Sequence, residues 1–278
     1  MTNENEVVSV GPDWMTVTTV KGDGVDDLQM IAFDIVQQHL PSDAVSKPWG
    51  MQGYRGKSYG SLKIGTRNSE EGILIISGEL CRRAYSAIPI DPFAVTRLDL
   101  QVTLRLDKPD VDHAMRFYNE KRQLQNQNTS GKLWRLVSSA TGNTLYYGKR
   151  GNVEMLRFYD KSIDYGFEQK GMAWRYEIEY GRKKAKAVAD VVGAMEDPYA
   201  EIVGMVALAY KKAGFPPQFK HNTTISAIES AVEVKTASSQ VRWLERNVRP
   251  VVTQLLMSGH EKEVIEALSL RQFCRERK

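Results

Sequence analysis

Cysteine and histidine are scarce in this sequence of 278 residues. The two cysteines, Cys81 and Cys274, lie far apart and fit neither a disulfide framework nor a zinc site. The four histidines, at positions 39, 113, 221 and 260, are also widely scattered. A metal site built from closely spaced cysteine or histidine ligands is therefore not expected.

Long apolar runs and nucleotide-binding loops are absent as well. Nowhere do about 18 apolar residues follow one another, and residues 1–7 are polar and acidic, without the apolar segment of a signal peptide. No G-x-x-x-x-G-K-[ST] loop occurs, so unwinding of DNA by this chain alone is not expected. These absences predict a cytoplasmic protein that is neither secreted nor bound to a membrane.

Basic charge is concentrated in one part of the chain. The net charge is only +4, which alone says little about nucleic-acid binding. Residues 145–187, however, contain ten lysines and arginines against six acidic residues, so this window carries an excess equal to that of the whole chain. The excess lies around Tyr159, Glu177 and Glu179, as phosphate binding at these residues requires.

Three segments, residues 95–104, 153–161 and 173–180, alternate apolar and polar residues as half-buried β-strands do. Their polar positions are Arg97, Asp99, Gln101 and Thr103, then Arg157, Tyr159 and Lys161, then Arg175, Glu177 and Glu179. In one sheet these positions would converge. Clustered carboxylates suit Mg²⁺ or Mn²⁺, and an adjacent tyrosine suits covalent attack on a phosphodiester. The alternative is an ordinary solvated face of charge pairs.

Short motifs at Asp13–Thr18, Thr96–Leu100, Tyr146–Arg150, Arg157–Lys161 and Trp174–Glu179 follow one another in a specific order. In this order they resemble the Rep_trans family, the rolling-circle replication initiators of plasmids and filamentous phages, together with related relaxases of conjugative elements. The resemblance covers about residues 13 to 185.

The resemblance implies roles for individual residues. Tyr159 matches the tyrosine that acts as the nicking nucleophile, while Asp99, Glu177 and Glu179 match acidic residues that hold the metal ion. It also implies origin DNA, single-stranded or in an extruded hairpin, as substrate, a host helicase and DNA polymerase as partners, and a homodimer at the origin. The metal would be Mg²⁺ or Mn²⁺.

Basic residues near these motifs are candidates for catalysis and DNA binding. Arg157 and Lys161 are expected either to lower the pKa of Tyr159 and stabilise the transition state, or simply to pair with the carboxylates. Residues 47–67 form a glycine-rich segment with interleaved aromatic and basic residues, which suits either DNA contact or a hairpin connection. The candidate DNA-binding residues are Arg55, Lys57, Lys149, Arg150, Arg175, Arg182 and Lys183.

Strand and helix patterns predict an α+β fold with a largely antiparallel sheet and packed helices. Three regions are expected: a disordered N-terminus over 1–11, a DNA-nicking domain over 12–190, and an all-helical region over 191–278 for DNA binding, dimerisation or sheet covering. His113, in a helix expected over 109–127, is predicted to lie at the surface rather than to act in catalysis.

The sequence therefore predicts a rolling-circle initiator: an origin-specific, metal-dependent DNA-nicking and strand-transfer enzyme acting through a 5′-phosphotyrosyl intermediate. Two alternatives remain open. One is a relaxase of a conjugative element with the same chemistry. The other is a non-catalytic protein that binds an origin or operator.

Overall fold

The computed structural model describes residues 6–19, 24–68, 70–125, 134–139, 142–149, 153–195, 197–219, 253 and 257–259. The chain divides into a compact unit of residues 1–228 and a second unit of residues 229–278. Almost all of the second unit lies outside the described residues, and the predicted all-helical region beyond residue 219 lies there with it. The architecture that follows is that of the first unit.

Ten strands form a single sheet in which every neighbouring pair is antiparallel, in the order β2-β3-β4-β5-β1-β6-β10-β9-β8-β7. The strands are β1 (Glu6–Thr18), β2 (Lys47–Met51), β3 (Tyr54–Tyr59), β4 (Leu62–Arg67), β5 (Glu71–Ser77), β6 (Ala94–Arg105), β7 (Trp134–Ser139), β8 (Gly142–Tyr147), β9 (Glu154–Asp160) and β10 (Ala173–Gly181). The predicted α+β fold with an antiparallel sheet is confirmed.

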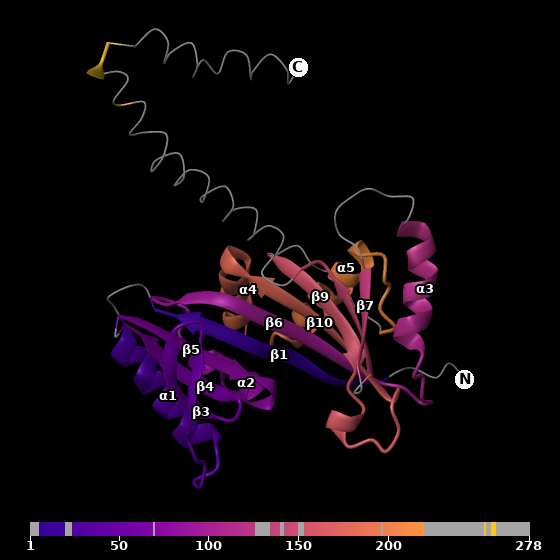
Figure 1. Cartoon of the computed structure of the whole chain (residues 1–278), viewed down its shortest axis with the longest axis horizontal. Helices are drawn as coiled ribbons and strands as arrows, with labels where there is room; N and C mark the ends of the chain where they lie inside the picture. The colour runs from indigo at the N-terminus through magenta and orange to yellow at the C-terminus, as the bar shows by residue number, and fades with distance from the viewer. Residues whose placement is uncertain are drawn as a thin grey trace. The chain divides into compact units, whose positions relative to one another are not determined.

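Helices cover one face of this sheet. They are α1 (Val25–His39), α2 (Gly78–Ala84), α3 (His113–Gln125), α4 (Arg182–Gly193) and α5 (Tyr199–Lys212), with short 3₁₀ turns at Tyr85–Ala87 and Ile163–Tyr165. Helix α1 packs on β4 and β5, α3 on β7 and β8, and α4 and α5 on β6 and β10, while α2 lies beside β1. In Figure 1, α1 accompanies β3–β5 at one end of the sheet and α3 accompanies β7 at the other.

Strand β6 shows how the two faces differ. Leu98, Leu100, Val102 and Leu104 are fully buried on the side that the helices cover, here called the apolar face. Burial of each such side chain contributes about 1.5–3 kcal/mol. The opposite side, here called the polar face, carries Asp99, Gln101 and Thr103, and these are fully buried as well. The expected alternation is present, but the polar face here is not an ordinary solvated one.

Aromatic rings fill the apolar face under α3 and α5. Phe158 stacks on Trp174 with ring centroids 4.7 Å apart, and both rings contact His113 at 5.2 and 5.6 Å. Phe215, just after α5, lies 4.8 Å from Phe158. The prediction that His113 lies at the surface is wrong, because this first residue of α3 points its ring towards the aromatic cluster.

Several predicted boundaries differ from the structure. Strand β1 begins at Glu6, so the prediction of disorder is wrong for residues 6–11, which pair with β6. Residues 47–67 form three antiparallel strands joined by short turns, which agrees with the hairpin alternative, and their glycines lie inside strands as well as in turns. The predicted domain boundary after residue 190 falls inside α4, and the compact unit continues through α5.

No helix among the described residues is long and apolar enough to cross a membrane.

Candidate active site

The three strands with the candidate catalytic residues lie side by side in the order β6-β10-β9. Across β10, Glu177 pairs with Gln101 of β6 and with Arg157 of β9. Arg175 pairs with Thr103 and Tyr159, and Glu179 pairs with Asp99. Since directly paired residues of antiparallel strands point to the same face, all these side chains meet on the polar face.

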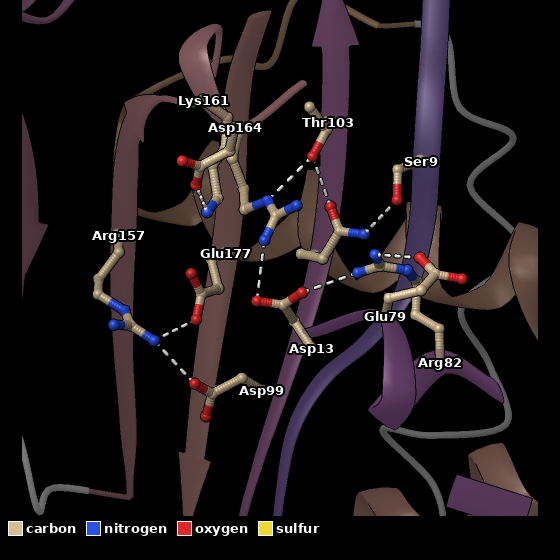
Figure 2. A network of polar contacts seen from close by, with 12 residues as sticks. Ser9, Asp13, Glu79, Arg82, Asp99, Thr103, Arg157, Lys161, Asp164 and Glu177 are labelled. Carbon is tan, nitrogen blue, oxygen red and sulfur yellow. Dashed lines mark hydrogen bonds and ion pairs between the residues drawn. The ribbon is translucent and has the colours of Figure 1, made fainter. Parts of the chain in front are cut away.

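Tyr159 and Glu177 form the centre of the site. The Tyr159 hydroxyl donates a hydrogen bond of 2.7 Å to Glu177 Oε2. The other carboxylate oxygen, Oε1, accepts from Arg157 Nη2, which also donates to Asp99 Oδ2 at 2.7 Å. Figure 2 shows the Arg157 guanidinium between the carboxylates of Glu177 and Asp99. A tyrosine, two carboxylates and a guanidinium are thus in direct contact.

Arg97 extends this network to the third carboxylate. Its Nε donates to Asp99 Oδ1 at 2.8 Å, and its Nη2 lies 3.0 Å from Glu179 Oε2. The Asp99 side chain is fully buried, and that of Glu179 is 6% exposed. Asp99 is therefore held on two sides by guanidinium groups, as a buried carboxylate requires.

Arg175 connects the site to the N-terminal strand. Its Nη1 donates to Asp13 Oδ2 at 2.8 Å, and its Nε donates to Thr103 Oγ1 at 3.0 Å. The other Asp13 oxygen accepts from Arg82 Nη1 of α2 at 2.8 Å, as Figure 2 shows. Asp13 lies at a register shift between Pro12 and Trp14, an irregularity of the kind that redirects a side chain in a strand.

Burial and charge set the ionisation of these groups. Burial and the neighbouring Glu177 carboxylate raise the pKa of Tyr159 well above its ordinary value, and Arg175 opposes this shift. Burial also raises the pKa of Asp99 against the effect of Arg97. For Glu177 burial acts in the same direction, but the charge of Arg157 prevails and its pKa is lowered.

Arg157 and Lys161 were expected to lower the pKa of Tyr159, whereas burial raises it in this structure. Arg157 instead pairs with Asp99 and Glu177, which was the alternative expectation for this residue. Lys161 pairs with Asp164, and its Nζ lies 5.8 Å from the centre of the Tyr159 ring.

The acidic residues fit a hard divalent cation in their chemistry. Asp99, Glu177 and Glu179 supply only oxygen ligands, which Mg²⁺ and Mn²⁺ prefer. Guanidinium groups lie between them, however, and among the described residues no group of three or more Asp, Glu, His or Cys side chains is arranged to hold a metal. A cation held by Asp99 and Glu177 would need Arg157 to leave the space between them.

The amino-acid sequence matches the replication initiation factor family over residues 94–268, a segment that contains Asp99, Tyr159, Glu177 and Glu179. The match spans more than half of the chain. The chain belongs to the replication initiation factor family. This confirms the family that the sequence motifs predict, and it makes the protein a replication initiator.

One solved structure with a similar fold is the rolling circle replication initiator protein from Geobacillus stearothermophilus. The sequences are 17% identical, the TM-score is 0.50, and the similarity covers 80% of this chain and 90% of the other. At this identity the likeness concerns the fold. No curated protein sequence matches the chain significantly.

The predicted DNA-binding residues of this initiator are not gathered in one place. Arg175 is 4% exposed and engaged with Asp13, so it belongs to the buried network. Arg55 and Lys57 are exposed on β3, while Lys149 follows β8 and Arg182 and Lys183 begin α4, all three exposed. Arg150 lies outside the described residues.

Sequence reasoning missed three residues of this site: Asp13, Arg82 and Tyr210. Asp13 begins one of the family-like motifs, which was a signal for its importance. Arg82 and Tyr210 come from helices. The Tyr210 hydroxyl accepts from Glu177 N at 3.0 Å and bonds to Arg157 O, so α5 reaches between β9 and β10 where the site lies.

Proposed function

We propose that this initiator starts rolling-circle replication by nicking one strand of origin DNA, with Tyr159 as the nucleophile. The observation that carries the proposal is the 2.7 Å hydrogen bond from the Tyr159 hydroxyl to Glu177, within a buried cluster of acidic and basic side chains. A strand-nicking enzyme needs a nucleophile whose proton has an acceptor in reach, together with positive charge for the phosphate.

In the proposed step the Tyr159 oxygen attacks the scissile phosphorus. The new phosphorus–oxygen bond makes a 5′-phosphotyrosyl link, and the bond to the 3′ oxygen breaks. The Tyr159 proton passes to Glu177 Oε2, which already accepts its hydrogen bond. The leaving 3′ oxygen takes a proton from solvent and becomes the primer end. Because the link conserves the phosphodiester energy, the reverse reaction can rejoin the strand after one round.

Arg157 is the candidate for stabilising charge on the phosphate. Its Nε is buried and has no hydrogen-bond partner in the part of the chain that the structure describes, so it retains a donor for a phosphate oxygen. A guanidinium group that donates to developing negative charge lowers the barrier of such a displacement. We assign Lys161 a weaker role at the edge of the site, because its ammonium group already pairs with Asp164.

Asp99, Glu177 and Glu179 are the residues that would hold Mg²⁺ or Mn²⁺ in this proposal. A bound divalent ion would supply Lewis-acid charge at the phosphate and so favour both the phenolate and the departing oxygen. Burial raises the pKa of Tyr159 in the protein alone, and the charge of such an ion would oppose this shift.

The decisive experiment is denaturing gel electrophoresis of the protein incubated with labelled single-stranded origin DNA, with Mn²⁺ or with a chelator. Wild type should form a covalent adduct only with Mn²⁺, and Tyr159→Phe should form none. Tyr146→Phe is the matched control, because Tyr146 is directly paired with Arg157 on the polar face but lacks the bond to Glu177. It should form the adduct like wild type.

Other outcomes separate the alternatives. An adduct that persists in Tyr159→Phe and disappears in Tyr146→Phe would move the nucleophile to Tyr146. No adduct from wild type on any origin strand would favour a non-catalytic protein that binds an origin or operator. Nicking at a transfer origin would assign the same chemistry to a relaxase.

A further inference from the structure

Aromatic and basic side chains extend the polar face from the active site towards the N-terminal edge of the sheet. They come from β1, β2, β3 and β4, and we call them the aromatic–basic track: Trp14, Trp49, Tyr54, Lys63 and Arg67. All five are partly exposed. The chemistry assigned to Tyr159 does not use them, so their arrangement needs its own explanation.

Strand register places the track on the same face as the site. Trp14 pairs directly with Asp99 of β6 and with Ser77 of β5. Further along, Lys63 of β4 pairs with Ile75, which in turn pairs with Thr16 of β1, two residues from Trp14. Because side chains two residues apart share a face, Trp14, Lys63 and the Asp99 carboxylate point to the same side.

Direct contacts confirm this placement. The Arg97 guanidinium lies 4.6 Å from the centre of the Trp14 ring, and Lys63 Nζ lies 5.5 Å from it. The Arg67 guanidinium lies 4.9 Å from the Tyr54 ring. Arg97 also binds Asp99, so a continuous set of contacts leads from the active site through Trp14 to Lys63.

Glycines make room for a flat ring on this face. Gly56 of β3 pairs with both Trp49 of β2 and Gly65 of β4, so two neighbouring strands present no side chain beside the indole. A Cβ atom at Gly65 would lie 3.2 Å from the Trp49 ring and 2.9 Å from the Arg55 carbonyl oxygen. The Trp49 ring therefore reaches past Gly56 of β3 to Gly65 of β4, and a larger residue at position 65 would displace it.

The two predicted DNA contacts of this region lie on the other face. Arg55 and Lys57 alternate with Tyr54, Gly56 and Ser58 along β3, so they point to the side that α1 covers elsewhere in the sheet. The basic residues of this region are thus divided between two faces. Lys47, Lys63 and Arg67 share the face of Tyr159.

We infer that the aromatic–basic track binds a single-stranded segment of the DNA next to the scissile bond. Alternating rings and cations suit unpaired bases, whose faces stack on aromatic side chains while the phosphates bind basic groups. From β2 to β6 the sheet spans five strand spacings, about 24 Å, which accommodates several nucleotides. The inference rests on the proposed nicking function, because it names the surface that leads the strand to Tyr159.

The test measures binding of a fluorescent oligothymidylate to the full chain by anisotropy, with chelator present so that no nicking occurs. Trp49→Ala should weaken binding by about 5- to 100-fold, and Trp49→Phe should restore most of the affinity. Lys63→Gln should weaken binding and reduce the salt dependence by about 0.7 in the slope of log K against log salt. Lys57→Gln, the matched charge loss on the opposite face, should bind like wild type.

Three results would overturn the inference. They are wild-type affinity in both Trp49→Ala and Lys63→Gln, an equal loss in Lys57→Gln, and an equal effect of Trp49→Ala on a duplex of the same length. The test is separable from that of the nicking function, because Tyr159→Phe should bind oligothymidylate normally. If the track variants bind normally while wild type still forms the Tyr159 adduct, the track fails and the nicking function stands.

Discussion

Strands β9 and β10 carry opposite chemistry on their two faces. On the apolar face, Phe158 and Trp174 stack with an interplanar angle of 12°. On the polar face of the same two strands, Arg157 and Glu177 form a buried ion pair. The Trp174 residue is 2% exposed and the Glu177 residue 1%, so β10 excludes water on both faces, whereas the Arg157 side chain of β9 is 17% exposed on the polar face.

The difference in chemistry separates stability from function. Burial of aromatic rings stabilises a fold directly, since each ring removes about 150–250 Å² of surface from water. Burial of charges carries a desolvation cost that ion pairing does not fully recover, and well-packed apolar residues often stabilise as well or better. The network around Glu177 is therefore poorly explained by stability alone, and it is well explained by a reaction that needs fixed charges.

The largest effect is expected from Arg157→Ala, which breaks the polar face. Removing this guanidinium leaves Asp99 and Glu177 facing each other without their shared counter-charge. In chelator the free energy of unfolding should fall by about 3–5 kcal/mol. If the carboxylates hold a divalent ion, Mn²⁺ at a hundredfold excess over its Kd should return about 2.7 kcal/mol. Urea unfolding with and without Mn²⁺ measures both quantities.

Arg116→Ala is the matched control for this experiment. Arg116 pairs with Asp110, but its side chain is 56% exposed, and an exposed ion pair contributes little to stability. This variant should unfold like wild type and show no additional response to Mn²⁺. A loss in Arg157→Ala that Mn²⁺ does not reduce would count against Asp99 and Glu177 as metal ligands.

A smaller effect is expected from Tyr210→Phe, which removes a hydroxyl that joins α5 to the backbone of β9 and β10. This group from the apolar face contacts the backbone of Arg157 and Glu177, the residues that face each other across β9 and β10. The variant keeps the ring and should lose about 1–2 kcal/mol of unfolding free energy. Because Glu177 positions Tyr159, the rate of adduct formation should fall as well, while DNA affinity stays unchanged.

Tyr180→Phe provides the comparison for Tyr210→Phe. Tyr180 is a buried tyrosine of β10 on the apolar face, 3% exposed, at a position paired with Glu154 rather than with a site residue. Its adduct rate should equal that of wild type. Equal adduct rates in Tyr210→Phe and wild type would mean that the hydroxyl serves only the packing of α5.

The sequence was most informative where one strand could be judged alone. Alternation predicted β6, β9 and β10 and named Asp99, Tyr159 and Glu177 on the face that they occupy. It could not predict that this face is buried, because burial depends on which strands adjoin and on side chains such as Asp13 that arrive from distant segments. Pairing of Arg157 with the carboxylates was one of two expectations for this residue, and its place between Asp99 and Glu177 follows from the register of β9 on β10.

The aromatic–basic segment illustrates a second limit. Arg55 and Lys57 were predicted as DNA contacts within residues 47–67, a glycine-rich segment that suited either DNA contact or a hairpin connection. In a strand, successive side chains point to opposite faces of the sheet. Lys57 pairs with Ile64, the neighbour of Lys63, so Lys57 and Lys63 lie on opposite faces. Glycines at positions 56 and 65 concealed the strands, although they are what allows Trp49 to lie flat there.

The smallest effect concerns His113, an imidazole inside the aromatic cluster of the apolar face. Burial lowers the pKa of His113. Asp110, which accepts its hydrogen bond at 3.1 Å, opposes this shift; of the weaker influences, Arg116 lowers the pKa further and Glu120 raises it. The folded protein thus resists protonation that the unfolded chain accepts near pH 6.5. The stability from this residue is complete above that pH and is lost as the pH falls through the lower, folded-state pKa.

His113→Phe keeps a ring in the cluster and removes the titration. Between pH 7.5 and 5.5 wild type should lose more unfolding free energy than the variant, by about 1 kcal/mol or less. Asp110, whose pKa is lowered by Arg116 first and also by His113, loses its contribution only at more acidic pH, below this interval. Urea unfolding at several pH values measures the two slopes. Parallel slopes would show that the apolar face, unlike the polar face, carries no charge that the fold must control.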